Sequence, residues 1–218
     1  MILAIDTATQ NAGLALYNQD TVYAEETWHA GRNHTIELMP RIARMLKTAN
    51  INVSELTAIA ISLGPGSFTG LRIGLAAAKG LALPHKLPLI GVSTLEVVVY
   101  PFQDRGLPVW GIIRAGRGRI FATCYVQIDE QWQALDEPHL TNFETLAPQI
   151  NTPSLCIGEI DEKSAQILRR GSGQKAKVVS TAARLRRAGY LAEIAAARLQ
   201  AGQQDDPDTL APIYPSPL

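Results

Sequence analysis

The chain has 218 residues, 46% of them hydrophobic and 18% charged, which is enough for one large domain or two small ones and argues against bulk disorder. Its formal net charge is zero, which argues against a chain-wide basic surface for nucleic acid but leaves open a local basic patch, or contact through a partner. The N-terminus lacks the pattern of a signal peptide, and no apolar run approaches the roughly 20 residues of a membrane span. Cys124 and Cys156 form no CxxC pair and are expected to be buried, reduced thiols. We therefore expect a soluble cytoplasmic protein.

The first half of the chain begins with short apolar runs and continues with helical patterns. The runs before residue 30 are separated by Asn, Gly and Asp, which favours a three-stranded antiparallel meander. A helix is expected over residues 35–49, where apolar residues recur at helical spacing. The expected elements are strands 2–5, 12–17 and 22–27, helix 35–49, strand 58–63, a glycine turn, helix 69–82, strand 89–92 and a helix starting at 93–96 with capping-box spacing.

A proline- and glycine-containing stretch over residues 100–108 predicts a link to a second lobe. The elements expected there are strands 109–113, 120–128 and 154–157, a helix over 161–170 and a helix over 181–201 with a break at Gly189. The tail, residues 203–218, contains four prolines and is expected to be extended. Antiparallel strands followed by alternating strands and helices predict an α/β fold with mixed sheets flanked by helices, in lobes of residues 1–105 and 106–218.

The turn Gly64-Pro65-Gly66-Ser67-Phe68-Thr69-Gly70 lies between a predicted strand and a predicted helix, as many phosphate-binding loops do. It has no P-loop lysine, because Leu71 follows Gly70, and its GxGxxxG spacing does not match the dinucleotide fingerprint GxGxxG. Two hypotheses remain. Amides at the helix N-terminus, with the hydroxyls of Ser67 and Thr69, suit an anion, whereas in the alternative one hydroxyl caps the helix and glycines allow close packing.

A second candidate turn, Asp6-Thr7-Ala8-Thr9, ends the first predicted strand. An acidic residue followed by hydroxyls in a hairpin can hold magnesium and phosphate, but Asp6 can equally cap its own turn. The histidines are poorly spaced for a metal site, because His34 is followed at i+4 by Leu38 rather than by a second ligand. No histidine or acidic residue lies near Ser67 in sequence to support nucleophilic catalysis.

Two arginine clusters have two interpretations, a solvated surface or contact with a phosphate backbone. The clusters are Arg114, Arg117 and Arg119, and Arg184, Arg186 and Arg187. No aromatic residues interleave the first cluster closely, so base stacking is not indicated.

Four strings together resemble the TsaB (YeaZ) family. They are MILAIDTAT at residue 1, RNHT at residue 32, GPGSFTGLRIG at residue 64 and GVSTL at residue 91, and the third is the most specific. The resemblance is dense over about the first 100 residues and returns weakly at residues 191–201 and 211–214. It implies an actin/Hsp70-like fold of two lobes and a role in forming threonylcarbamoyladenosine next to the anticodon of tRNAs that read codons beginning with A.

The resemblance also implies a supporting rather than a catalytic subunit. In the family, a TsaD-type paralogue binds the metal through an HxxxH pair and performs the transfer, a TsaE-type P-loop ATPase joins the two, and tRNA is bound through the complex. This implies no catalytic or metal-binding residue here, and no cofactor for the chain alone, although ATP or ADP at the subunit interface is compatible with it. The residues that would border such a nucleotide are Asp6, Thr7, Gly64, Gly66, Ser67 and Thr69.

The first helix gains a second interpretation from the resemblance. A helical apolar stripe is usually core, but in the family this helix and the one after the glycine turn pack against TsaD or a second copy. The expected interface residues are Ile36, Met39, Ile42, Ala43 and Leu46. Two other hypotheses stay open, an ATP-dependent enzyme of the sugar-kinase type and a glycoprotease-like metallopeptidase. The chain also departs from the family at residues 114–119, where Arg114 and Arg119 replace acidic residues and Gly116 replaces an arginine.

Overall fold

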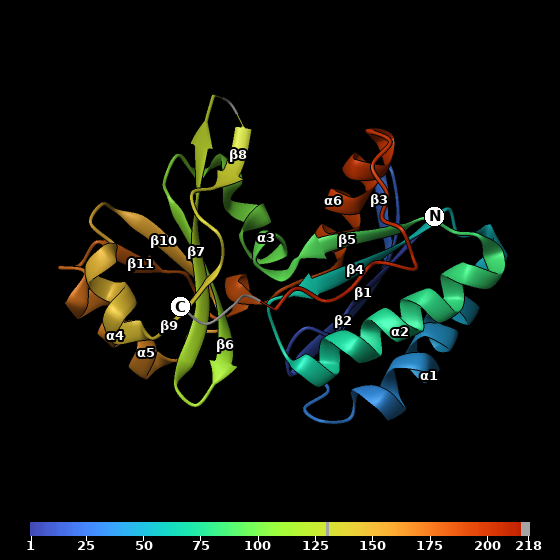
Figure 1. Ribbon diagram of the computed structural model, residues 1–218, viewed down its shortest axis with the longest axis horizontal. Helices are drawn as coiled ribbons and strands as arrows, with labels where there is room; N and C mark the ends of the chain where they lie inside the picture. The colour runs from blue at the N-terminus through green and yellow to red at the C-terminus, as the bar shows by residue number, and fades with distance from the viewer. Residues whose placement is uncertain (130, 215–218) are drawn as a thin grey trace. The chain divides into compact units, whose positions relative to one another are not determined.

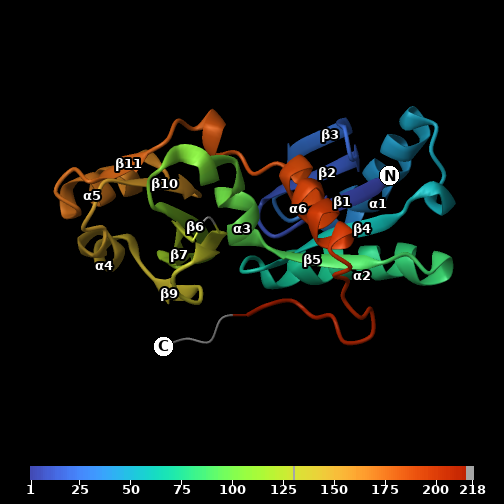
Figure 2. The ribbon, with the colours of Figure 1, turned by 90° about the horizontal axis from the view of Figure 1, so that it is seen from above.

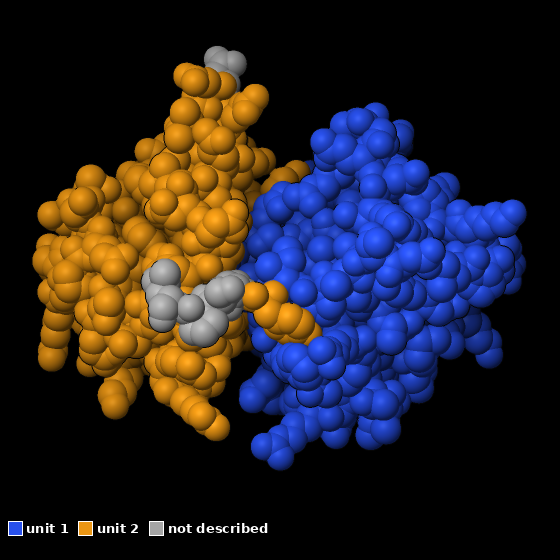
Figure 3. Space-filling view, viewed as in Figure 1, with its two compact units in different colours: residues 1–97, 187–213 blue, residues 98–186, 214–218 orange. Residues whose placement is uncertain are grey.

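The computed structural model describes residues 1–129 and 131–214 and forms two compact units (Figure 3). The first unit contains Met1–Val97 and Arg187–Ile213, and the second contains residues 98–186 together with Tyr214. The sequence predicts a division at residues 105/106 that leaves the whole C-terminal segment in the second lobe. In the structure, helix α6 (Ala188–Gln200) returns to the first unit because it packs across strands β1 (Ile2–Asp6) and β2 (Asn11–Asn18).

The first unit is built on a five-stranded mixed sheet in the order β3-β2-β1-β4-β5 (Figure 1). Its other strands are β3 (Thr21–His29), β4 (Ala58–Gly64) and β5 (Leu89–Ser93). Strands β1, β2 and β3 form the predicted antiparallel meander, and β4 and β5 run parallel to β1. Strands β1 and β4 are buried along their whole length because both faces of the sheet are covered by helices.

Helices α1 (His34–Ala49) and α2 (Phe68–His85) cover one face of this sheet, and α6 crosses the other (Figures 1 and 2). The core under α1 and α2 is rich in leucine and isoleucine, including Leu3, Ile5 and Ile61. The face toward α6 instead carries small residues. A side chain at Gly13 would lie 3.3 Å from the Ala188 methyl group, so a small residue here lets α6 approach the sheet closely.

The second unit contains a six-stranded sheet in the order β11-β10-β6-β7-β8, with β9 paired to β7. The strands are β6 (Val109–Gly116), β7 (Arg119–Ile128), β8 (Gln131–Ala134), β9 (His139–Thr141), β10 (Ser154–Gly158) and β11 (Ala176–Val178). Helix α3 (Thr94–Val99) follows β5 directly, and α4 (Phe143–Leu146) and α5 (Glu162–Gly171) belong to the second unit. The order β8-β7-β6-β10-β11 repeats the order of the first sheet, including an antiparallel meander followed by parallel strands. The mixed α/β architecture predicted from the sequence is therefore confirmed.

The predicted helix over 181–201 is wrong at its beginning. A short 3₁₀ turn (Ala182–Arg184) precedes α6, and Gly189 lies inside the helix rather than at a break. The Gly189 amide lies in the first turn of α6, where helical amides have no partner in the helix, and it donates a 2.8 Å hydrogen bond to the Glu25 carboxylate.

The segment after α6 runs back along the first unit. The Asp205 carboxylate accepts a 2.6 Å hydrogen bond from the Gly91 amide, and the Ile213 amide donates to the Leu63 carbonyl at 2.8 Å. The last part of the predicted extended tail, residues 215–218, lies outside the described residues. None of the helices in the described part of the chain has the length and apolar character needed to cross a membrane.

Candidate functional site: the glycine turn and the exposed faces of α1 and α2

The glycine turn packs directly against the turn that follows β1. Side-chain atoms added at Gly66 and Gly70 would lie closer than 3.0 Å to the carbonyl oxygens of Ala8 and Thr7, respectively. The Ser67 amide donates a 2.6 Å hydrogen bond to the Ala8 carbonyl. Glycine is therefore required at both positions because two backbones meet there.

Asp6 and Thr7, which the sequence suggests as nucleotide contacts, are 2% and 0% exposed. One Asp6 oxygen accepts hydrogen bonds from the Ser62 hydroxyl at 2.8 Å and from the Ala8 amide at 3.0 Å. The Thr7 hydroxyl donates to the Gly70 carbonyl at 2.8 Å. These polar groups join β1, β4 and the start of α2 inside the first unit.

The rest of the predicted nucleotide set is divided between buried and exposed positions. Gly64 is buried and its amide donates to the Thr94 hydroxyl at 3.1 Å, whereas Ser67 and Thr69 are exposed. The Ser67 hydroxyl caps α2 by accepting a 3.2 Å hydrogen bond from the Gly70 amide. This contact matches the cap hypothesis for the turn.

The apolar stripe of α1 is divided between the core and the surface. Ile42 and Leu46 are 1% and 7% exposed and belong to the core of the first unit, so their predicted place in a partner interface is wrong. Ile36 and Met39 are 70% and 45% exposed, and Ala43 is also exposed. The spacing i, i+3, i+7 places these three residues on one outward face.

Helix α2, which packs beside α1, adds exposed apolar residues that the sequence reasoning missed. Phe68 and Leu83 are each more than half exposed, and Ala76 and Gly80 lie on the exposed side between them. The Arg72 guanidinium lies 3.8 Å from the centre of the Phe68 ring, a cation–π distance. The signal in the sequence is the helical periodicity of α2: once the inward-facing positions are assigned to the core, the remaining positions mark the outward face.

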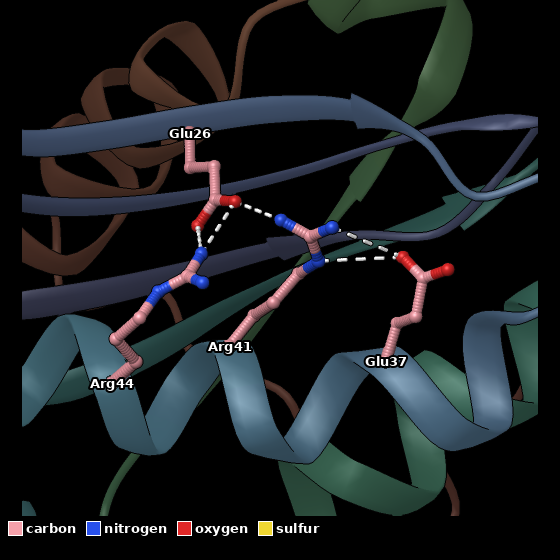
Figure 4. Close-up of polar contacts among 4 residues, drawn as sticks. All are labelled: Glu26, Glu37, Arg41 and Arg44. Atoms are coloured by element: carbon pink, nitrogen blue, oxygen red, sulfur yellow. Dashed lines mark hydrogen bonds and ion pairs between the residues drawn. The ribbon is translucent and has the colours of Figure 1, made fainter.

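An ion-pair network fixes α1 against β3 (Figure 4). Glu26 on β3 pairs with Arg41 and, at 2.8 Å, with Arg44, and Arg41 also pairs with Glu37 at 3.2 Å. The Arg41 guanidinium lies 4.5 Å from the centre of the Trp28 ring. Networks of partly buried charges hold side chains more firmly than single exposed pairs, so the outward face of α1 is presented from a defined position.

His34 is buried, and its Nε2 lies 2.9 Å from the Thr9 carbonyl oxygen. Leu38, one turn later, is a core residue with 1% exposure. Within residues 1–129 and 131–214, no group of three or more His, Cys, Asp or Glu side chains is arranged to hold a metal ion.

The sequence matches a family model over most of its length and curated relatives over about half of it. The model of the family described as "TsaD: tRNA N6-adenosine threonylcarbamoyltransferase" matches residues 26–211. The chain is 48% identical over 94 residues to the tRNA threonylcarbamoyladenosine biosynthesis protein TsaB of Escherichia coli K12, covering 43% of this chain and 40% of that protein. It is 36% identical over 124 residues to TsaB of Bacillus subtilis 168, covering 57% and 54%. The chain spans about half the length of the curated relatives it matches.

The fold also matches solved structures. The structure titled "YeaZ from Pseudomonas aeruginosa" aligns with a TM-score of 0.79 and 22% identity over 98% of both chains, which shows the fold alone. The mixed α/β fold expected from the resemblance is confirmed, because it is shared with the YeaZ structures. The chain belongs to the family described by the TsaD model, and the predicted resemblance to the TsaB (YeaZ) family is confirmed by its similarity to the TsaB relatives.

Proposed function

We propose that this chain is a non-catalytic scaffold subunit that activates formation of threonylcarbamoyladenosine next to the anticodon of tRNAs that read codons beginning with A. It binds a TsaD-type catalytic subunit through the partner face, which we define as the exposed residues Ile36, Met39, Ala43, Phe68 and Leu83. The partner face is the observation that carries the proposal. A TsaE-type ATPase and the tRNA join through the complex, and the same face pairs two copies of the chain when the partner is absent.

The composition of the partner face supports a protein partner. All five of its residues are apolar, with Ile36 and Phe68 more than half exposed, and the charged residues Arg44 and Arg72 lie on the same two helices. Protein interfaces commonly place an apolar centre inside a polar rim. Adjacent exposed apolar side chains on two packed helices are costly in water unless a partner covers them.

The proposal is tested with Met39→Glu in an assay that contains a TsaD-type and a TsaE-type subunit, tRNA, ATP and threonylcarbamoyl precursors. Burial of one methionine side chain contributes about 2 kcal/mol, or about thirtyfold in Kd, and a buried glutamate adds a further cost. We expect at least that loss in partner affinity by calorimetry, with parallel loss of modified nucleoside. Ile128→Glu is the control because Ile128 is 40% exposed but lies on β7, in the second unit and outside the partner face.

Two results would overturn the proposal. One is modification that proceeds equally well without this chain, and the other is Met39→Glu behaving like the unchanged protein. Ile42→Glu is unsuitable for this purpose because Ile42 is a core residue, so any loss of binding would be inseparable from unfolding.

We further propose that ATP or ADP is held at the interface between subunits and that this chain contributes its exposed hydroxyls, Ser67 and Thr69. The burial and internal hydrogen bonds of Asp6 and Thr7 support this over nucleotide binding by the lone chain. Calorimetry with ATP and magnesium decides between them. We expect no heat from the chain alone, whereas tight binding abolished by Asp6→Ala would favour the sugar-kinase hypothesis.

A further inference from the structure

The second unit contains a long segment with basic residues and no acidic ones. From Lys163 to Arg186 the sequence has seven Lys and Arg residues and no Asp or Glu. This segment forms most of α5, the turn after it, the edge strand β11 and the 3₁₀ turn before α6. Because the whole chain has zero net charge, this excess of cations is local to the segment rather than spread over the protein.

Some of these cations have internal roles. Arg169 pairs with Glu162 at 3.3 Å, and Arg184 donates a 2.6 Å hydrogen bond to the Ile160 carbonyl. Four others are exposed and form no ion pair within residues 1–129 and 131–214. We call them the basic edge: Lys163, Arg170, Lys175 and Lys177.

The basic edge is held on ordered backbone. Lys163 and Arg170 are seven positions apart on the exposed side of α5, which separates them by about 10 Å along the helix axis. The buried Ser172 hydroxyl joins the end of α5 to β11, because it donates to the Arg169 carbonyl at 3.3 Å and accepts from the Ala176 amide at 3.0 Å. The Lys175 carbonyl accepts a 3.0 Å hydrogen bond from the Ser154 amide. Helix α5 packs against β11, which is an edge strand of the second sheet (Figure 2).

We infer that the basic edge binds the phosphate backbone of the tRNA on which the assembled complex acts, an inference that rests on the function proposed above. Exposed cations without ion-pair partners, carried on ordered backbone, suit a polyanion, since each contact releases counterions from the nucleic acid. No Phe, Tyr or Trp lies between residues 163 and 186, so the contact is to the backbone and carries no base readout. The two arginine clusters described from the sequence do not form the centre of this contact with tRNA.

The test compares R170Q/K175Q/K177Q with R105Q/R117Q/R119Q, which removes the same charge from other exposed positions of the second unit. Binding of unmodified tRNA to the assembled complex is measured at several salt concentrations. We expect the first variant to bind tRNA at least about tenfold more weakly at low salt. The plot of the logarithm of its association constant against the logarithm of the salt concentration should also be shallower, with a slope smaller in magnitude by about 2. The control changes affinity less than about threefold, and both variants keep their affinity for the TsaD-type subunit.

Equal affinity and slope for the first variant and the unchanged protein would overturn the inference, as would an equal loss in the control. Loss of affinity for a protein subunit without loss of tRNA binding would also overturn it, by assigning the basic edge to an acidic protein surface. The same titration with the free chain separates the two proposals. If the chain forms no complex with the TsaD-type subunit, yet neutralising the basic edge still lowers the affinity of the free chain for tRNA, the proposed function is refuted and the inference about the basic edge stands.

Discussion

Replacement of Gly70 by alanine tests whether the glycine turn is a packing device. In an open helix position this change would stabilise the protein by up to about 1 kcal/mol. At Gly70 the new methyl group would lie within 3.0 Å of the Thr7 carbonyl oxygen, so α2 must move away from the turn after β1. Overpacking of this kind costs about 1–3 kcal/mol, and weakening the hydrogen bond from the Thr7 hydroxyl to the Gly70 carbonyl adds about 1 kcal/mol.

We therefore expect Gly70→Ala to lower the free energy of unfolding by about 2–4 kcal/mol, which corresponds to about 4–16 °C in Tm for a chain of this size. Gly80→Ala is the matched control on the same helix, because no atom lies within 4 Å of its added methyl group. It should leave Tm unchanged or raise it slightly. Thermal unfolding followed by circular dichroism measures both variants. Equal stability of Gly70→Ala and the unchanged protein would refute the packing account and would favour the alternative hypothesis that the turn is open to an anionic ligand.

Two further predictions concern titratable groups of the second unit. Hydrogen bonds from Ser164, with a smaller contribution from Arg114, lower the pKa of Asp161 to about 2, so its stabilisation is present above pH 4 and is lost as the pH falls toward 2. Asp161→Asn, which keeps a capping side chain, should lower Tm at pH 7 and not at pH 2; a difference that persists at pH 2 would contradict this cause. Burial raises the pKa of Cys124 to about 11 and of Cys156 to about 12. Both thiols should therefore react with Ellman's reagent at pH 8 at least about a hundredfold more slowly in the folded protein than in denaturant, and fast labelling of the folded chain would refute their burial.

Helix α1 shows how far periodicity alone leads. The apolar spacing correctly predicts a helix within one residue of its observed bounds, because an amphipathic stripe is a local property of the sequence. The same stripe does not separate Ile42, which packs on the sheet, from Met39, which faces outward. Which residues of the stripe face the core depends on the angle at which α1 packs on the sheet, and this angle is set by residues on the strands, far from α1 in sequence. A wide apolar stripe therefore predicts a helix and its inward side, but not the boundary between core and interface.

The glycine turn presents a similar limit at longer range. Its sequence favours a tight approach at a helix N-terminus and is equally compatible with phosphate or with another backbone. The choice depends on Thr7 and Ala8, which lie about 60 residues earlier and fill the space beside Gly66 and Gly70. The short strands β8, β9 and β11 were not predicted for a related reason: at three or four residues each, they are too short to show alternation and depend on pairing with longer neighbours.

Arg114 is the position where local sequence was most misleading about function. Where the family resemblance leads one to expect an acidic residue, an arginine suggests a reversed surface charge open to nucleic acid. In the structure, its guanidinium pairs with Asp161 at 2.6 Å and its amide donates to the Glu159 carboxylate at 2.8 Å. These partners lie more than 40 residues away in sequence, and they return the local charge close to balance. An arginine with two nearby carboxylates offers little net field to a phosphate, whereas the cations of the basic edge have no such partners in residues 1–129 and 131–214. The number of basic residues in a motif is thus a poor guide to nucleic-acid contact until the carboxylates that neutralise them have been located in space.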